Sequence, residues 1–88
     1  MKQFSATIID PIGLHARPAS ELVKIASSFQ ANINIISKGK TGNAKSIMNV
    51  MALGIKQGEE ITITADGADE TPAIEKIQAE LTNLKLIG

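Results

Sequence analysis

The residues best suited to chemistry in this chain stand together between Gly13 and Ser20, in the stretch GLHARPAS. His15 is the only histidine and Arg17 the only arginine among 88 residues, and Pro18 follows directly. A neutral imidazole is a nucleophile that can form a covalent intermediate, and a guanidinium group offers a planar fork that suits phosphate. These residue types at this spacing predict that His15 takes up an anionic group, for which phosphoryl is the natural candidate.

A helix that begins directly after His15 would supply the rest of this site. Proline is tolerated in the first turn of a helix, where its missing N–H is not needed, so Pro18 indicates a helix start near Ala16. The amides of Ala16 and Arg17 then lack partners within the helix and favour an anion. A cation in the first turn opposes the helix dipole by about 0.3–1 kcal/mol. Arg17 is therefore poorly placed unless an anion visits it.

A plainer interpretation of His15 is a polar or exposed residue at a helix start, and the residue pattern alone leaves both interpretations open. A metal site is not expected, because the chain has no second histidine and no cysteine. No cofactor is expected either. Because the chain has no cysteine, disulfides and cysteine-based zinc sites are excluded.

Length and composition place the chain among ordinary folded proteins. Eighty-eight residues predict a single domain over 1–88, and 43% apolar residues with only Phe4 and Phe29 as aromatics predict an aliphatic core. The first residues alternate in polarity, and no apolar run is long enough to cross a bilayer. We therefore expect a cytoplasmic protein with no membrane insertion.

The charge distribution is uneven although the formal net charge is zero. Residues 1–58 carry seven basic and two acidic side chains, whereas residues 59–88 carry two basic and seven acidic ones. A small nucleic-acid-binding domain is a possible class for the basic half, but scattered lysines and scarce aromatics argue against it. We expect no nucleic acid and instead an acidic protein partner.

The hydrophobic pattern predicts the element order βαββαβα. Alternation typical of half-buried strands covers residues 4–8, 32–37 and 60–65, and a short, weak strand is expected over 40–43. Helical spacing predicts a first helix from about Ala16 and a second over 47–53, after the Ser46 cap. A third helix follows the start signals Asp69, Thr71 and Pro72, and its apolar line runs through Ile74, Ile77, Leu81 and Leu84. One antiparallel sheet covered on one side by helices follows, which is the α+β class.

The segment after Ser46 carries more apolar residues than one buried helix face can hold. Serine is a good N-cap, and a structural cap is its plainest interpretation. Because a domain this small buries only one face of a short helix, some of the following apolar side chains must stay exposed. Either they are core residues in excess or they form a docking surface, and methionines favour the second. We expect a partner-docking rim around His15, formed by Leu14, Ala16, Ile47, Met48, Met51 and Gly54.

Two motifs carry a resemblance to a known family. The segment Gly13-Leu14-His15-Ala16-Arg17-Pro18-Ala19 resembles the phosphohistidine signature of the HPr family, the histidine-containing phosphocarriers of the phosphoenolpyruvate-dependent sugar phosphotransferase system. The segment Lys45-Ser46-Ile47-Met48-Asn49-Val50-Met51 is similar to the regulatory serine segment of family members from low-GC Gram-positive bacteria and mollicutes. The chain departs from relatives at Ile12, where some are polar, and at Asn49, where many have glycine.

The resemblance implies a fold, a function and partners. It implies an open-faced β-sandwich, with a four-stranded sheet in the order 1-4-2-3 and three helices on one face. His15 would accept a phosphoryl group from phosphorylated enzyme I on Nδ1 and pass it to sugar-specific enzyme IIA domains. Arg17 would balance its charge, and the amides of Ala16 and Arg17 would bind it. Such a protein is a co-substrate rather than an enzyme, and we expect a monomer.

Regulation at Ser46 is also implied by the resemblance. An ATP-dependent kinase, of the HPr kinase/phosphorylase type, would phosphorylate Ser46. An alternative function stays open, in which the chain is mainly a regulatory binding module whose Ser46-phosphorylated form binds a transcription regulator.

Overall fold

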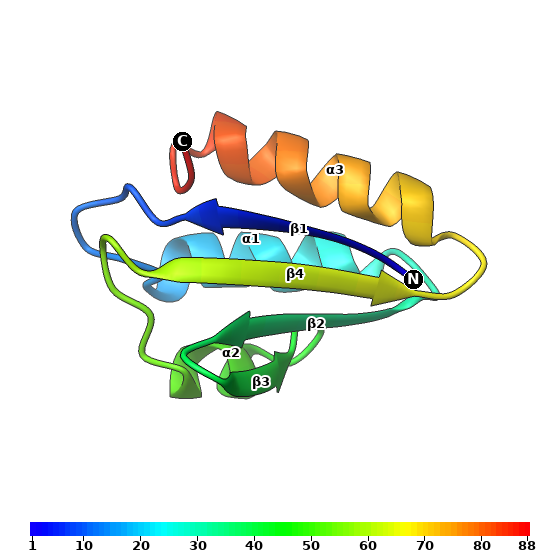
Figure 1. The fold of residues 1–88 in the computed structure, drawn as a ribbon, viewed down its shortest axis with the longest axis horizontal. Coiled ribbons are helices and arrows are strands. Elements are labelled where there is room, and N and C mark those ends of the chain that lie inside the picture. Colours follow the sequence, from blue (N-terminus) through cyan, green and yellow to red (C-terminus); the bar gives the residue numbers. More distant parts are fainter.

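The computed structural model describes residues 1–88 and has the predicted order of elements. The strands are β1 (Lys2–Thr7), β2 (Asn32–Ser37), β3 (Lys40–Asn43) and β4 (Glu60–Asp66), and the helices are α1 (Ala16–Ser27), α2 (Ile47–Ala52) and α3 (Glu70–Asn83). The strands form one antiparallel sheet in the order β1-β4-β2-β3, with α1 and α2 behind the strands and α3 beside β1 in Figure 1. The predicted α+β class and strand order are confirmed.

The register of the sheet aligns its apolar side chains on one face. Ile63 at the centre of β4 lies opposite Phe4 of β1 on one side and Ile35 of β2 on the other. Successive side chains of a strand point to opposite faces, so these positions share the face against which the helices pack. The core there consists of Ile, Leu, Val and Ala, while Phe4 and Phe29 only border it. The predicted aliphatic core is confirmed.

One expectation about α3 is wrong. Leu84 does not continue the buried line of the helix, because α3 ends at Asn83 and Leu84 is 40% exposed. Lys85 adopts a left-handed conformation with φ of 57°, which turns the chain so that Leu86 and Ile87 enter the core instead. Asp69 stands at the N-cap as expected, but its side chain makes no capping hydrogen bond.

The C-terminal residues hold the end of β1 in place. The amide of Ile9 donates to the carbonyl of Leu86 at 2.8 Å, and Ile8 forms a β-bridge with Ile87. Leu86 and Ile87 are both almost completely buried. The loop that carries Asp10 to His15 therefore begins from a fixed point.

None of the helices combines the length and apolar character that crossing a membrane requires.

Candidate phosphoryl-transfer site around His15

His15 occupies the N-cap of α1, as the sequence predicts. Its backbone is extended, with φ of −88° and ψ of −176°, and its side chain makes no capping hydrogen bond. The imidazole is 32% exposed. Pro18 is buried at the third helical position, where the absence of an N–H costs no hydrogen bond. The helix start therefore positions the imidazole, and neither ring nitrogen is engaged in capping the helix.

The loop before His15 is fixed by a glycine. Gly13 has a φ of +83°, and a Cβ added there would lie 2.6 Å from the carbonyl oxygen of Ile55 and 2.8 Å from the Cα of Lys56. Only glycine fits both this conformation and this close approach. The next residue, Leu14, donates its amide to the Ile55 carbonyl at 3.0 Å. Ile55 and Lys56, which lie between α2 and β4, thus support the loop that presents His15, and we call this segment the Ile55 platform.

Positive character gathers at the start of α1 without a partner. The amides of Ala16 and Arg17 take part in none of the loop or cap hydrogen bonds, as expected for the first turn of a helix. Arg17 is exposed, and no carboxylate lies within 4 Å of its guanidinium group. An anion placed beside His15 would meet donors that nothing else in the protein uses.

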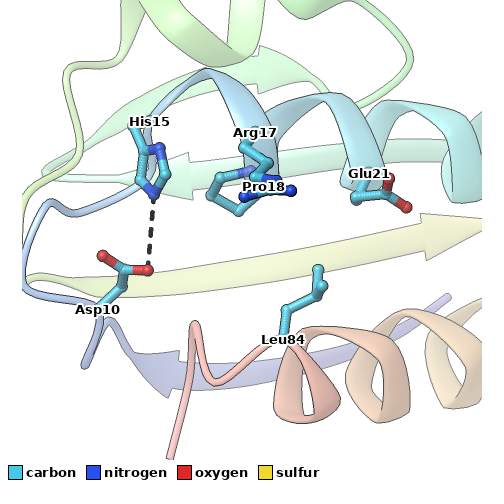
Figure 2. A pocket seen from close by; sticks show the side chains of 6 residues that line it. All are labelled: Asp10, His15, Arg17, Pro18, Glu21 and Leu84. Atoms are coloured by element: carbon cyan, nitrogen blue, oxygen red, sulfur yellow. Dashed lines mark ion pairs between the residues drawn. The ribbon is translucent and has the colours of Figure 1, made fainter.

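These residues border an open pocket to which three parts of the chain contribute. Figure 2 shows the loop after β1, the first two turns of α1 and the residue after α3 meeting around it. The lining residues are Asp10, His15, Arg17, Pro18, Glu21 and Leu84. The structure therefore brings His15 and Arg17 together as predicted. It also adds Asp10, Glu21 and Leu84, which sequence reasoning did not assign to the site.

Asp10 is the most informative of these additions. Its Oδ2 atom lies 3.6 Å from Nε2 of His15, the ion pair that Figure 2 marks. Its Oδ1 atom accepts a hydrogen bond from the amide of Ile12 at 2.8 Å. Asp10 also opens a turn, in which its carbonyl accepts from the amide of Gly13 at 2.9 Å. The signal that could have revealed its second role is a carboxylate in a tight turn that ends next to the histidine.

Ser46 is the N-cap of α2, as predicted, and it has a partner that the sequence did not reveal. Its Oγ accepts from the backbone amide of Asn49 at 3.3 Å and from the Asn49 side-chain nitrogen at 3.1 Å. The Asn49 side-chain oxygen in turn accepts from the amide of Asn43 at 3.4 Å. Asn49 therefore connects the cap of α2 to the end of β3. A glycine at this position would provide no such connection.

The residues of the predicted docking rim fall into two groups. Met48 is 79% exposed, Met51 41% and Ile47 38%, and together these three form what we call the α2 patch. Ala16 and Gly54 are also exposed. Leu14, in contrast, belongs to the hydrophobic core with only 5% of its surface exposed. The expected excess of apolar residues on α2 is therefore real, but Leu14 offers a partner little surface.

Lys45 has a structural contact that its place in a basic region did not suggest. Its ammonium group donates to the carbonyl of Phe29 at 2.8 Å, just beyond the end of α1. A cation is favourable beside the last carbonyls of a helix. Lys40 is exposed and has no ion pair.

No three His, Cys, Asp or Glu residues lie together in a way that could hold a metal ion.

Comparison with known proteins places this geometry in a family. A family model described as the PTS HPr component phosphorylation site matches residues 2–83. The phosphocarrier protein HPr of Mycoplasma capricolum is 58% identical over 87 residues, covering 99% of this chain and 98% of that protein. The HPr of Mycoplasma genitalium is 50% identical over 88 residues, covering 99% of this chain and all of that protein.

Similarity in three dimensions is equally close. A solved structure of a histidine-containing phosphocarrier protein, described in connection with the divergence of Mycoplasma from Gram-positive bacteria, has a TM-score of 0.96 to this chain. It is 57% identical, and the likeness covers 98% of both chains. The chain therefore belongs to the HPr family, the phosphocarrier proteins of the phosphotransferase system.

Proposed function

We propose that residues 1–88 form a single phosphocarrier domain in which Nδ1 of His15 accepts a phosphoryl group from phosphorylated enzyme I and passes it to an enzyme IIA domain. The observation that carries the proposal is the position of His15: a partly exposed imidazole at the N-cap of α1, beside an arginine without an ion pair and free first-turn amides. Membership of the HPr family supports enzyme I and enzyme IIA as the partners. We expect the protein to act as a monomer in the cytoplasm.

The transfer is a displacement at phosphorus. The lone pair on Nδ1 attacks the phosphorus atom, the bond from phosphorus to the donor breaks, and its electron pair returns to the donor. The proton on Nε2 stays on the ring, so the product is a phosphorylated imidazolium. The reverse sequence delivers the group to the acceptor. Nδ1 takes part in no hydrogen bond in the structure, which leaves it available for attack.

Charge at the start of α1 is suited to receive the group. The transferred phosphoryl oxygens carry negative charge, and the amides of Ala16 and Arg17 point outward at the positive end of the helix. The guanidinium of Arg17 can form two parallel hydrogen bonds with such an anion. Because Arg17 has no carboxylate to leave, it pays no cost of breaking an ion pair when the anion arrives.

Labelling tests the phosphocarrier assignment directly. We expect incubation with phosphoenolpyruvate and enzyme I to add one phosphoryl group that is labile in acid and stable in base. The variant His15→Ala should not be labelled, whereas Ser46→Ala, as a control, should be labelled as the wild type is. Undiminished labelling of His15→Ala would contradict the assignment.

The α2 patch is proposed as the main part of the surface on which both partners dock. Its exposed side chains adjoin Gly54, and α2 packs against α1, which carries Ala16. Methionine side chains adapt to differently shaped partners, which suits a protein that must meet a donor and an acceptor in turn. The contribution expected of Leu14 reduces to the edge of its side chain.

We further propose that phosphorylation of Ser46, by an enzyme of the HPr kinase/phosphorylase type, regulates docking. Ser46 is partly exposed at the start of α2, directly before the α2 patch. A phosphate there adds a charge of about −2. It weakens the local positive field of Lys40 and Lys45 and so disfavours an acidic partner. The same form is suited to bind a transcription regulator, which is the second role proposed for this surface.

The substitution Ser46→Asp tests this regulation. A carboxylate is a good N-cap, so we expect the melting temperature to stay close to that of the wild type while affinity for enzyme I falls. Gln3→Glu adds a single negative charge on exposed β1, at the opposite edge of the sheet from β3, and should leave affinity unchanged. A large loss of stability with unchanged affinity would reject the mechanism.

A further inference from the structure

We propose that Asp10 is a positioning residue, whose carboxylate holds the His15 imidazole in the tautomer protonated on Nε2 and so leaves the lone pair on Nδ1 free. The proposal deepens the function proposed above and rests on it. Its starting point is the 3.6 Å separation between Asp10 Oδ2 and His15 Nε2. No other carboxylate oxygen lies within 4 Å of a ring nitrogen, although Glu21 lines the same pocket.

The backbone holds the Asp10 carboxylate in this place. Its Oδ1 atom accepts from the amide of Ile12 at 2.8 Å, and its own carbonyl accepts from the amide of Gly13 at 2.9 Å. One residue earlier, Ile9 is tied to the C-terminal tail through Leu86. With Oδ1 occupied inside the turn, Oδ2 is the atom that faces the ring. The carboxylate is 22% exposed, so water competes with the ring only in part.

The chemistry of the two groups decides which nitrogen carries the proton. An ionised carboxylate only accepts hydrogen bonds, and a neutral imidazole has one N–H donor and one lone pair. A ring nitrogen that faces a carboxylate is therefore favoured as the donor, and the other nitrogen keeps the lone pair. Since Asp10 faces Nε2, the nucleophilic lone pair falls on Nδ1, the atom that the proposed transfer uses.

The same carboxylate becomes more favourable after transfer. Once Nδ1 is phosphorylated and Nε2 still carries its proton, the imidazole ring is cationic, and Asp10 is its nearest counter-charge. Hydrogen bonds at such sites are often long in the resting state and shorten as charge develops. Arg17 serves the phosphoryl oxygens, so the two charged residues divide the work: Arg17 balances the anion and Asp10 the ring. Arg17 and Asp10 form no ion pair with each other.

Nitrogen NMR of the ring tests the proposal on the unphosphorylated protein. Long-range ¹⁵N–¹H correlation spectra above the titration range of the imidazole distinguish the Nε2–H from the Nδ1–H tautomer. The test variant is Asp10→Asn, which retains an oxygen for the Ile12 amide but removes the carboxylate charge. Glu21→Gln is the matched control, because it removes the other carboxylate of the same pocket. Backbone amide spectra of Ile12 report whether the turn is retained.

We expect the wild type to hold Nε2–H as the major tautomer. Asp10→Asn should lower the ratio of Nε2–H to Nδ1–H by about two- to fivefold, the range of a partly exposed ion pair, and Glu21→Gln should not change it. Equal ratios in wild type and Asp10→Asn would overturn the proposal. So would a wild-type spectrum in which Nδ1–H dominates, a result that needs no variant to fold.

The two proposals fail in distinguishable ways. If His15 is never labelled by enzyme I, the phosphocarrier assignment fails while the tautomer measurement keeps its meaning. If His15 is labelled but the tautomer ratio does not depend on Asp10, only the role of Asp10 is rejected.

Discussion

Arg17 and Lys24 are cations at opposite ends of the same helix, and they face opposite electrostatic environments. Lys24 lies in the last turn of α1, where the helix dipole favours positive charge, and Arg17 lies in the first turn, where it does not. Neither has an ion pair. A cation kept at the unfavourable end has its natural explanation in an anion that binds there during transfer.

This contrast predicts opposite effects of the same substitution. In the unphosphorylated protein, Arg17→Gln should raise the free energy of unfolding by about 0.3–1 kcal/mol, and Lys24→Gln should lower it by a similar amount. Urea unfolding at low salt measures both. In the phosphorylated protein Arg17→Gln should shorten the life of the adduct, and Lys24→Gln should leave it unchanged. A loss of stability in unphosphorylated Arg17→Gln would show that Arg17 has a structural role instead.

The predictability of single residues follows from how local their signals are. His15, Arg17 and Ser46 can be identified from the sequence because each lies at or next to a helix start that the sequence predicts. Asp10 and Asn49 do not, because their partners are chosen by turn geometry that determines which oxygen points where. Leu84 enters the site from the far end of the chain, and no local pattern could place it there.

Among the elements, the junction between α1, β2 and α3 depends on Asp69. Its two carboxylate oxygens accept from the amides of Gln30 and Ala31, each at 2.8 Å, just before β2 begins. The amide of Gln30 above all, and then that of Ala31, hold the pKa of Asp69 below its ordinary value of 3.8, against the opposing effect of desolvation. The side chain therefore joins the start of α3 to the start of β2 instead of capping its own helix.

This junction predicts a pH-dependent stability. Because the folded state lowers the pKa of Asp69, its stabilisation is present above pH 3.8 and disappears as the pH falls through the lower folded pKa. Asp69→Asn should therefore lower the melting temperature clearly at pH 7 and progressively less as the pH falls below 3.8. Glu75→Gln changes an exposed carboxylate of α3 that has no ion pair, and should show no such pattern. An equal loss of melting temperature in Asp69→Asn at pH 7 and at a pH well below 3.8 would contradict this account.

The elements themselves were predictable where burial is periodic. Alternating isoleucines in β2 and β4 and the three-and-four spacing in α1 predict structure because each sets one face against the core. The end of α3 was not predictable in this way. Leu84 continues the helical spacing, but Lys85 takes a left-handed conformation that such patterns do not indicate. The strand order came from family resemblance, since periodicity does not determine which strands are neighbours.

At the scale of the whole molecule, the C-terminal tail meets the end of β1 next to the site. Leu86 and Ile87 are buried against the end of β1. The loop that follows β1 carries Asp10 and, after a turn, leads to His15. The pocket therefore takes its shape from the loop after β1 and from the residue after α3, as Figure 2 shows for Asp10 and Leu84. A small domain has little stability to lose, about 5–15 kcal/mol in total, so this closure matters for folding as well as for the site.

Two leucines separated by one residue provide a matched test of this closure. Leu86 is completely buried, whereas Leu84 is 40% exposed. Leu86→Ala should lower the free energy of unfolding by about 2–5 kcal/mol, while Leu84→Ala should change it by only about 0.5 kcal/mol. Because Ile9 donates to the Leu86 carbonyl, hydrogen exchange at the Ile9 amide should accelerate in Leu86→Ala and stay slow in Leu84→Ala. Similar effects of the two substitutions would mean that the tail rests on the surface, and that the loop bearing Asp10 and His15 is held by the Ile55 platform alone.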